Sequence, residues 1–563
     1  MTSKTSSVRN LLKFTLKKQT PQTLLATAFA LMVCPGMLIA AVNDAAEYRH
    51  DAYDMSNYFS QFSSIIFVMA VLSLIFLLVS NFSFLFSKKA GDMYHALPLT
   101  RNELLFARAS ASFIGAGFVM TLPYAALWLS NNFFSTQVSA AMFIETYLLM
   151  LLFLLTLTVF TLVFVVISGG IFDCLIALFA VNAGIPALGL VFVHFYNSGS
   201  YGIESTANPV SYLSPFTFAL TRIVDFSEGF LYKGLSVGTA LLSWLGLFGY
   251  TLLTQAASAV IAIKLFHKRK SETAGESYSF KFVPAVLSTI ISMAGGYLIG
   301  MIASSTYTFS ELDFWIFFIL GSTLSSIAFG VIANRGFKKL SHSFIRGGVA
   351  ILLTIVSVIT VALISAHDVQ YLPKAEKVGE ISAFDGTCTF TEKKDIETFI
   401  KLHKTVIENH EEGIFVKYYE VSDVIYNTEG FDFEYLMTNG KKIKRNYGTH
   451  AIFAKNSSPL VLELLSSDAF YEKYNDCITP DEGLIALTKE TVDGKNETVP
   501  ISAEVAKSII DTFKAEMRLA DTDIFSEGCV WINIRGKGDR HIYIPESFTE
   551  TVKLVESLFP EPV

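Results

Sequence analysis

The chain contains nine apolar segments, each long enough to cross a lipid bilayer, within its first two thirds. They cover residues 23–42, 62–86, 107–129, 141–167, 171–195, 235–264, 283–303, 313–333 and 347–366. A hydrocarbon core about 30 Å thick needs roughly 20 apolar residues in a helix. Lipid offers no water to satisfy the backbone of open, irregular structures. The sequence therefore predicts a polytopic α-helical membrane protein with about nine transmembrane helices.

The composition agrees with this fold class. Hydrophobic residues make up 52% of the 563 residues and charged residues 17%, whereas soluble domains usually carry about 25% charged residues. The formal net charge of −7 averages basic loops and an acidic tail, and no arginine-rich face indicates nucleic-acid binding. The five cysteines include no CxxC pair and no zinc-ligand spacing. We therefore predict no metal site and no nucleic-acid partner.

The loop charges predict the orientation and the domain boundaries. Residues 1–22 interleave basic and apolar positions, so we expect a short helix in the cytoplasmic interface. A six-helix core, 23–264, is followed by the cytoplasmic loop 265–282, which has the strongest basic bias. Three additional helices occupy 283–366. An odd number of spans then places the tail, 367–563, outside the cell.

The loop at 87–106 carries signals of ordered structure. Pro98 disfavours helix at Leu97, and Thr100 with Glu103 forms a T-x-x-E capping box. We expect a turn followed by a capped helix that leads into the third span. Other polar residues of the loop are Asp92, His95 and Arg101. Because no nucleophile accompanies them, a protein-docking loop is favoured over a catalytic site.

Several motifs expected of energy-converting membrane proteins are missing from the sequence. It has no G-x-x-x-x-G-K-[ST] phosphate loop. The spans hold few ionisable residues, which argues against an ion-coupled carrier. Asn182 and Gln255 are the polar residues to note within the spans. Interhelical hydrogen bonding is their default interpretation, and a substrate pathway is the alternative.

Two motifs resemble a known family. Asp92–Arg101, D-x-Y-H-x-L-P-L-T-R, is similar to the first cytoplasmic loop of ABC exporter permeases of the second class. These permeases are the transmembrane subunits of bacterial peptide, lipid and drug exporters. Arg269–Phe280, RKSETAGESYSF, is similar to the R-x-x-E-x-A-G-x-x-x-x-F signature of a Gram-positive branch. A looser third match is Tyr212–Phe216. The resemblance covers about residues 1–350.

The resemblance implies partners and roles for particular residues. It implies a separate cytoplasmic ATPase subunit that binds ATP and Mg, and a second permease copy or paralogue in the membrane. No cofactor and no enzymatic activity are then expected in this chain itself. The candidates for ATPase docking are Asp92, His95, Leu97, Pro98, Arg101, Glu103, Arg269, Glu272 and Gly275. Two alternatives stay open, namely that Arg269 only sets the topology and that Gly275 only ends a helix.

The tail has the composition of a soluble α+β domain. We expect a strand near 376–390, a helix over 392–409, a hairpin turning at Asn439-Gly440, a helix over 459–475, a strand near 483–488, a helix over 502–518, a hairpin turning at 536–538 and a helix over 548–559 capped by Ser547 and Glu550. This order suggests a weak internal duplication of strand, helix, hairpin and helix.

A basic run lies on the first hairpin of the tail, at Lys441, Lys442, Lys444 and Arg445. One interpretation is an edge strand that lysines protect against aggregation. The alternative is a site for an anionic lipid or wall polymer.

The leading hypothesis is the permease of an ATP-driven exporter in a bacterial plasma membrane, with a cytoplasmic N-terminus. It would move a peptide, lipid or drug-like substrate outward by alternating access. The alternative is a membrane sensor whose external domain detects a peptide antibiotic or cell-wall precursor without net transport. A membrane enzyme with catalytic residues in the tail is a third possibility, but no spacing of nucleophile and base supports it.

Overall fold

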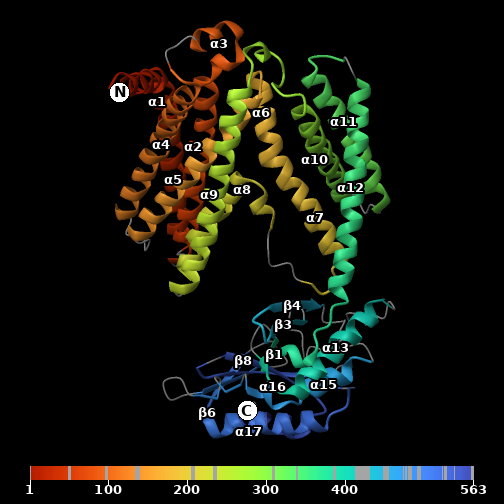
Figure 1. Ribbon diagram of the computed structural model, residues 1–563. Coiled ribbons are helices and arrows are strands. Elements are labelled where there is room, and N and C mark those ends of the chain that lie inside the picture. Colours follow the sequence, from red (N-terminus) through yellow and green to blue (C-terminus); the bar gives the residue numbers. More distant parts are fainter. Residues whose placement is uncertain are drawn as a thin grey trace. The chain divides into compact units, whose positions relative to one another are not determined.

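The computed structural model describes residues 2–48, 52–95, 99–133, 140–203, 209–232, 237–306, 311–337, 340–383, 388–411, 431–447, 456–472, 474–475, 478–479, 485–490, 496–522, 524, 529–537 and 539–559. The chain forms two compact units (Figure 1). One comprises residues 1–193 and 208–357, and the other comprises residues 194–207 and 358–563. Each unit has its own hydrophobic core.

The first unit is helical. Its elements are α1 (Thr2–Tyr48), α2 (Ala52–Asn81), η1 (Ser83–Phe86), α3 (Lys88–His95), α4 (Arg101–Phe133), α5 (Ala140–Ile167), α6 (Ile171–Phe179), the π-helical η2 (Ala180–Gly184), α7 (Ile185–Gly199), η3 (Pro209–Leu213), α8 (Pro215–Tyr232), α9 (Val237–Lys268), η4 (Ser271–Thr273), α10 (Val283–Thr306), α11 (Glu311–Ala333) and α12 (Leu340–Val369). The last turns of α7 and α12 belong to the second unit.

Eight stretches of helix in the described residues are long and apolar enough to cross a membrane. They are Phe59–Asn81, Arg101–Leu129, Ala140–Ile167, Ile171–Asn197, Trp244–Lys268, Val283–Ala303, Leu312–Ala333 and Leu340–Val369. Each corresponds to one of the predicted spans. The remaining predicted span, 23–42, falls within α1, whose side chains beyond Met32 lie outside the described residues.

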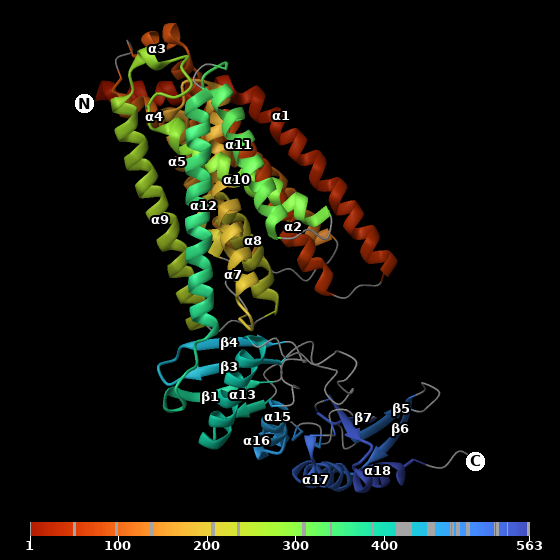
Figure 2. The same cartoon turned by 90° about the vertical axis from the view of Figure 1, so that its right-hand side faces the viewer.

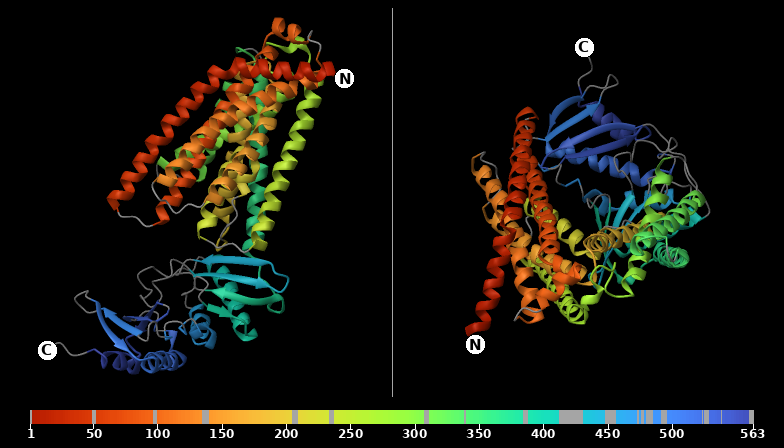
Figure 3. Two further views of the ribbon diagram at one scale, coloured as in Figure 1. Left: turned by 90° about the vertical axis from the view of Figure 1, so that its left-hand side faces the viewer. Right: turned by 90° about the horizontal axis from the view of Figure 1, so that it is seen from above.

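The N-terminal helix differs from the prediction. Residues 1–22 are not a separate helix, because α1 continues through residue 22 to Tyr48; the interfacial position of these residues stays a prediction. Figure 3 shows that α1 bends, so that its first turns run at an angle to the remainder. The side-chain oxygen of Gln19, on this helix, accepts a hydrogen bond from Asn81 of α2 at 2.7 Å. This bond fixes α1 against the rest of the bundle.

The bundle is built around α2, which contacts α1, α4, α5 and α8. Leu74 on α2, Phe153 on α5 and Phe218 on α8 are almost fully buried in its core. Helix α8 is therefore part of this core. Its face bearing Phe218, Ala219 and Ile223 is buried because those apolar positions pack into the bundle.

Helices α10 and α11 pack closely through small residues. A Cβ atom at Gly296 would lie 2.8 Å from the carbonyl oxygen of Phe318, and one at Gly300 would lie 2.8 Å from the ring of Phe314. Only glycine permits this approach. Gly296 and Gly300 thus allow the two helices to pack at close range.

The second unit contains two antiparallel sheets. The first has the order β2-β1-β3-β4 and the second β6-β5-β7-β8; Figure 2 labels β1, β3 and β4 of the first sheet and β5, β6 and β7 of the second. The strands are β1 (Val378–Ala383), β2 (Cys388–Phe390), β3 (Phe431–Met437), β4 (Lys442–Tyr447), β5 (Ile485–Glu490), β6 (Asn496–Ile501), β7 (Cys529–Arg535) and β8 (Asp539–Pro545). In chain order, each sheet places its second strand at one edge and its fourth at the other. The two halves of the unit thus share one sheet topology. Each half contains four strands, one more than the predicted order of strand, helix, hairpin and helix provides.

Helices accompany both sheets. They are α13 (Lys393–Glu411), α15 (Ser458–Leu465), α16 (Asp468–Glu472), α17 (Ala503–Leu519) and α18 (Thr549–Glu556), with the short η5 (Ala375–Lys377) before β1. The predicted helix over 459–475 is divided, and Ser466 lies between its two parts. The predicted first hairpin is present, but its turn has three residues, since Met437 donates to the carbonyl of Lys441 and Gly440 takes a positive φ of 81°.

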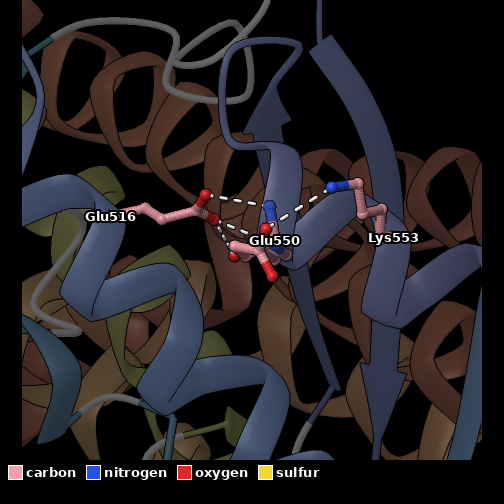
Figure 4. Close-up of polar contacts among 4 residues, drawn as sticks. Glu516, Glu550 and Lys553 are labelled. Carbon is pink, nitrogen blue, oxygen red and sulfur yellow. Dashed lines mark hydrogen bonds and ion pairs between the residues drawn. The ribbon is translucent and has the colours of Figure 1, made fainter.

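The N-terminus of α18 is capped from another helix. Ser547 and Glu550 do not form the predicted cap, because Phe548 occupies the capping position and makes no side-chain bond. Instead, the Glu516 carboxylate on α17 accepts bonds from the backbone amides of Glu550 and Thr551, at 3.0 and 2.9 Å, and from the Thr551 hydroxyl at 2.5 Å (Figure 4). A carboxylate suits the positive end of the helix dipole. Glu516 therefore joins α17 to α18.

We predict that Glu516→Ala lowers the free energy of unfolding of the C-terminal unit by about 1–2 kcal/mol, the usual cost of a lost cap. Hydrogen exchange at the amides of Glu550 and Thr551 should become faster. Asp511→Ala, at an exposed position of the same helix, is the control. Equal effects of the two substitutions would contradict the capping role.

His403 on α13 is buried as a neutral side chain among aromatic rings. It is 1% exposed, its Nδ1 lies 3.1 Å from the Tyr435 hydroxyl, and Nε2 has no partner within the described residues. Burial, with a smaller contribution from the positive charge of Arg445, lowers the pKa of His403 to about 3. The folded unit thus excludes a proton that the unfolded chain binds below a pH of about 6.5.

We therefore predict that the stability of this unit falls as the pH decreases from about 6.5 toward 3, by up to about 1.4 kcal/mol per pH unit. Chemical unfolding of the full-length protein at pH 7 and pH 5 measures this slope. The slope should be smaller in His403→Phe and unchanged in His541→Phe, which alters an exposed histidine. An unchanged slope in His403→Phe would assign the acid sensitivity to other groups.

Candidate functional site

The two predicted docking segments meet at one end of the helical unit. Helix α3 lies at the end where α4 begins (Figures 1 and 2), and it contacts η4 of the second segment. We use the name loop junction for residues 83–95, 99–103, 165–170 and 269–280. These segments come from three distant regions of the sequence, near residues 90, 168 and 275, and arginine side chains hold them together.

Arg269 is the most buried cation of the loop junction, with 7% of its surface exposed. One terminal nitrogen, Nη1, donates to the carbonyl oxygens of Val165 and Val166 at 3.2 and 2.6 Å, and the other, Nη2, donates to that of Leu85 at 2.7 Å. Val165 and Val166 are in the last turn of α5, whose carbonyls have no partner within the helix. Arg269 therefore caps α5 and fastens it to η1.

Burial lowers the pKa of Arg269 to about 10, so the side chain stays charged at neutral pH. All three of its hydrogen-bond acceptors are backbone carbonyls. The negative end of the α5 dipole favours a cation at this position. The charge is thus matched by oriented peptide groups.

Arg101 fixes the start of α4 to the end of α9. Its Nη1 donates to the carbonyls of His267 and Phe266 at 2.8 and 3.2 Å. The predicted capping box is also present. The Thr100 amide donates to the Glu103 carboxylate at 2.7 Å, and the Glu103 amide donates to the Thr100 hydroxyl at 3.3 Å. The first docking segment is therefore ordered by local caps and by a bond to the second.

Gly275 makes a sharp turn that brings the second segment against the loop between α5 and α6. Its φ is +86°, a conformation that glycine adopts at little cost. Its amide donates to the carbonyl of Gly169 at 3.0 Å, and the Gly169 amide donates to that of Ser277 at 3.0 Å. A Cβ atom at Gly169 would lie only 2.0 Å from the Glu276 carbonyl oxygen. Both glycines are thus required by the backbone pairing.

The other predicted docking residues lie on η4, on α3 or outside the described residues. Glu272 is exposed on η4. Asp92 and His95 are on α3, but their side chains lie outside the described residues, as do Leu97 and Pro98 entirely.

The two predicted pathway residues, Asn182 and Gln255, both form hydrogen bonds with other residues of the helical unit. Asn182, in the π-helical η2, accepts a hydrogen bond from Ser214 at 2.8 Å and donates to the carbonyl of Leu178 at 3.0 Å. Gln255 on α9 donates to the Thr156 hydroxyl on α5 at 2.9 Å. Both side chains thus make the interhelical or local bonds of the default interpretation.

Sequence reasoning missed Arg108 on α4. It is 4% exposed, and its guanidinium lies 4.7 Å from the ring centroid of Phe84 and 4.3 Å from that of Tyr94. These cation–π contacts hold η1 and α3 against α4. The sequence does offer a signal for this residue, because Arg108 is a lone arginine within the apolar segment 107–129. A charge in such a segment needs a specific partner.

The loop junction is densely packed. The cavity beside Arg269, lined by Leu85, Phe266 and Ala274 among others, has a volume of about 10 Å³, which is room for about one water molecule. This cavity beside Arg269 is therefore too small for a ligand larger than water. Among the described residues, no group of three His, Cys, Asp or Glu side chains is placed to hold a metal ion.

No protein-family model, no curated protein and no solved structure matches this chain in comparisons with each.

We predict that Arg269→Lys destabilises the helical unit. A lysine ammonium is a point charge without the planar fork that reaches two separate helix ends, so at least one buried carbonyl loses its donor, at about 1–3 kcal/mol. Thermal unfolding in detergent measures the loss. Hydrogen exchange at the amides of Gly169 and Gly275 should also become faster.

Lys270→Gln is the matched control, because it removes a positive charge from an exposed neighbour. Equal melting temperatures for Arg269→Lys and the wild type would show that the guanidinium fork is dispensable.

Proposed function

We propose that the chain is the transmembrane subunit of an ATP-driven exporter of the ABC type. The observation that carries the proposal is that the two segments resembling exporter permeases lie together at one loop junction. Arg101 of the first segment donates to the carbonyls of Phe266 and His267 at the end of α9 and, at 3.5 Å, to the carbonyl of Arg269, the first residue of the second segment. A docking surface shared by two loops requires such a juxtaposition.

The eight apolar helices support a membrane location. We propose a multi-pass protein of a bacterial plasma membrane, with the loop junction and the N-terminus on the cytoplasmic side and the C-terminal unit outside. The basic residues 267–270 at the end of α9 support this orientation.

The proposed mechanism uses the arginine contacts as mechanical links. A separate ATPase binds the loop junction, and its nucleotide-driven closure moves the segment that begins at Arg269. The Arg269 side chain passes this displacement to α5, and Arg101 couples α9 with α4. Alternating exposure of a pathway between two permease subunits follows if these helices move as rigid elements. The substrate class is a peptide, a lipid or a drug-like molecule.

In this proposal the chain is not itself an enzyme. ATP and Mg bind to the partner ATPase, and this chain needs no cofactor of its own. A second permease copy or a paralogue completes the membrane part.

A membrane sensor is the second candidate function. One observation favours it, namely a basic pocket in the C-terminal unit. In that case the pocket would detect a ligand and the loop junction would transmit the signal without substrate flux. Transport assays in vesicles separate the two candidates.

We predict that the chain, purified from its native host in mild detergent, carries an ATPase at about one copy per chain. Glu272→Arg reverses a charge exposed on the loop junction and should lower the recovered ATPase by about tenfold. Asp511→Arg makes the same change at an exposed position of the C-terminal unit and should leave recovery unchanged.

The absence of any ATPase, under conditions that preserve other membrane complexes, would refute the exporter proposal. It would direct attention to a receptor or an enzyme.

A further inference from the structure

The C-terminal unit contains a cavity of about 540 Å³ at the edge of its first sheet. Its walls include Tyr196 from the last turns of α7, Asp368 from the last turn of α12, and Lys441, Lys442, Lys444 and Arg445 from the β3–β4 turn and β4. The volume lies within the range of typical ligand pockets, about 300–1,000 Å³. It is far larger than the roughly 10–15 Å³ that one water molecule needs, and it has room for a lipid headgroup or a small phosphate ester.

The cavity is positively charged. Four basic side chains, Lys441, Lys442, Lys444 and Arg445, line it together with two carboxylates, those of Asp368 and Glu434. Both carboxylates are already engaged. Glu434 pairs with Lys442 at 2.6 Å, and Asp368 accepts a hydrogen bond from the Tyr196 hydroxyl at 2.9 Å. Within the described part of the chain, Lys441 and Lys444 have no ion-pair partner.

Arg445 is built into the wall of the cavity. Only 5% of its surface is exposed. Its Nη2 donates to the carbonyl of Asp368 at 2.9 Å, and Nη1 donates to that of Lys444 at 3.1 Å, while Nε has no partner in the described residues. The Arg445 guanidinium bonds to backbone carbonyls, interacts with the Tyr447 side chain and has no ion-pair partner among the described residues, so it adds positive charge to the cavity. The lowered pKa of His403, to which Arg445 contributes, is consistent with that field.

The position of the cavity limits the source of the ligand. Its walls include the ends of two helical stretches that are long and apolar enough to cross a membrane. One of them ends at Asn197 and the other at Val369. Tyrosines near the ends of such stretches typically lie at the level of lipid headgroups. Tyr371, which is 41% exposed, also lines the cavity.

We propose that this cavity binds a phosphate group, carried either by an anionic lipid headgroup or by a soluble phosphate ester. Lys441 and Lys444 supply mobile ammonium donors, and the fixed Arg445 contributes positive charge from behind. Several donors converging on one site suit the oxygens of a phosphate. This inference goes beyond the proposed transport function and does not depend on it, because it uses only residues of the C-terminal unit.

The test uses the full-length chain, purified and stripped of lipid, without any ATPase. In one arm, native mass spectrometry measures the retention of phosphatidylglycerol, with phosphatidylcholine as the reference lipid. In the other arm, thermal shift measures the binding of glycerol 3-phosphate. The test variant is Lys441→Gln with Lys444→Gln. The control is Lys507→Gln with Lys537→Gln, which removes the same charge from exposed positions of the second half.

We expect the wild type and the control to bind phosphatidylglycerol about tenfold more tightly than the test variant, equivalent to about 1.4 kcal/mol. Binding should weaken as the salt concentration rises. An effect confined to the lipid arm identifies a headgroup as the source, and stabilisation by glycerol 3-phosphate identifies a soluble ester. Equal binding by the test and control variants in both arms, or no binding by the wild type, would overturn the proposal.

Discussion

The helical unit depends on one interaction, that between the buried Arg269 guanidinium and the backbone carbonyls at the end of α5. The last carbonyls of a helix have no partner within it, and at a packed loop junction little water is available to replace one. Arg269 supplies donors to Val165, Val166 and Leu85 at once. Its single side chain thereby sets the position of three segments, and the oriented helix dipole stabilises its charge.

Two other arginines also bind the backbone carbonyls at the end of a helix. Arg101 binds the last carbonyls of α9, and Arg445 binds the carbonyl of Asp368 in the last turn of α12. In each case a planar guanidinium joins a helix end to a segment distant in sequence. At the loop junction, this makes the proposed docking surface continuous with α4, α5 and α9. In the C-terminal unit, it leaves a positive wall beside a cavity.

The elements that the sequence predicts well are those whose signals are local. The apolar spans and the Thr100–Glu103 capping box depend on residues close together in the chain. The partners of Arg269 could not be predicted in this way, because Leu85 is 184 residues away. The cap of α18 was missed for the same reason, since Glu516 belongs to another helix. The edge strand β6 was also missed, because it is polar and contains Pro500, so its composition resembles that of a loop.

The central claim is that the loop junction is the surface through which a separate ATPase drives the helices. The most direct test is hydrogen exchange at the backbone amides of residues 269–279, measured on the chain alone and on the chain with its co-purified ATPase. The account predicts slower exchange in this segment when the ATPase is bound, with no change in β3 and β4. Unchanged exchange at 269–279 in the presence of bound ATPase would contradict it.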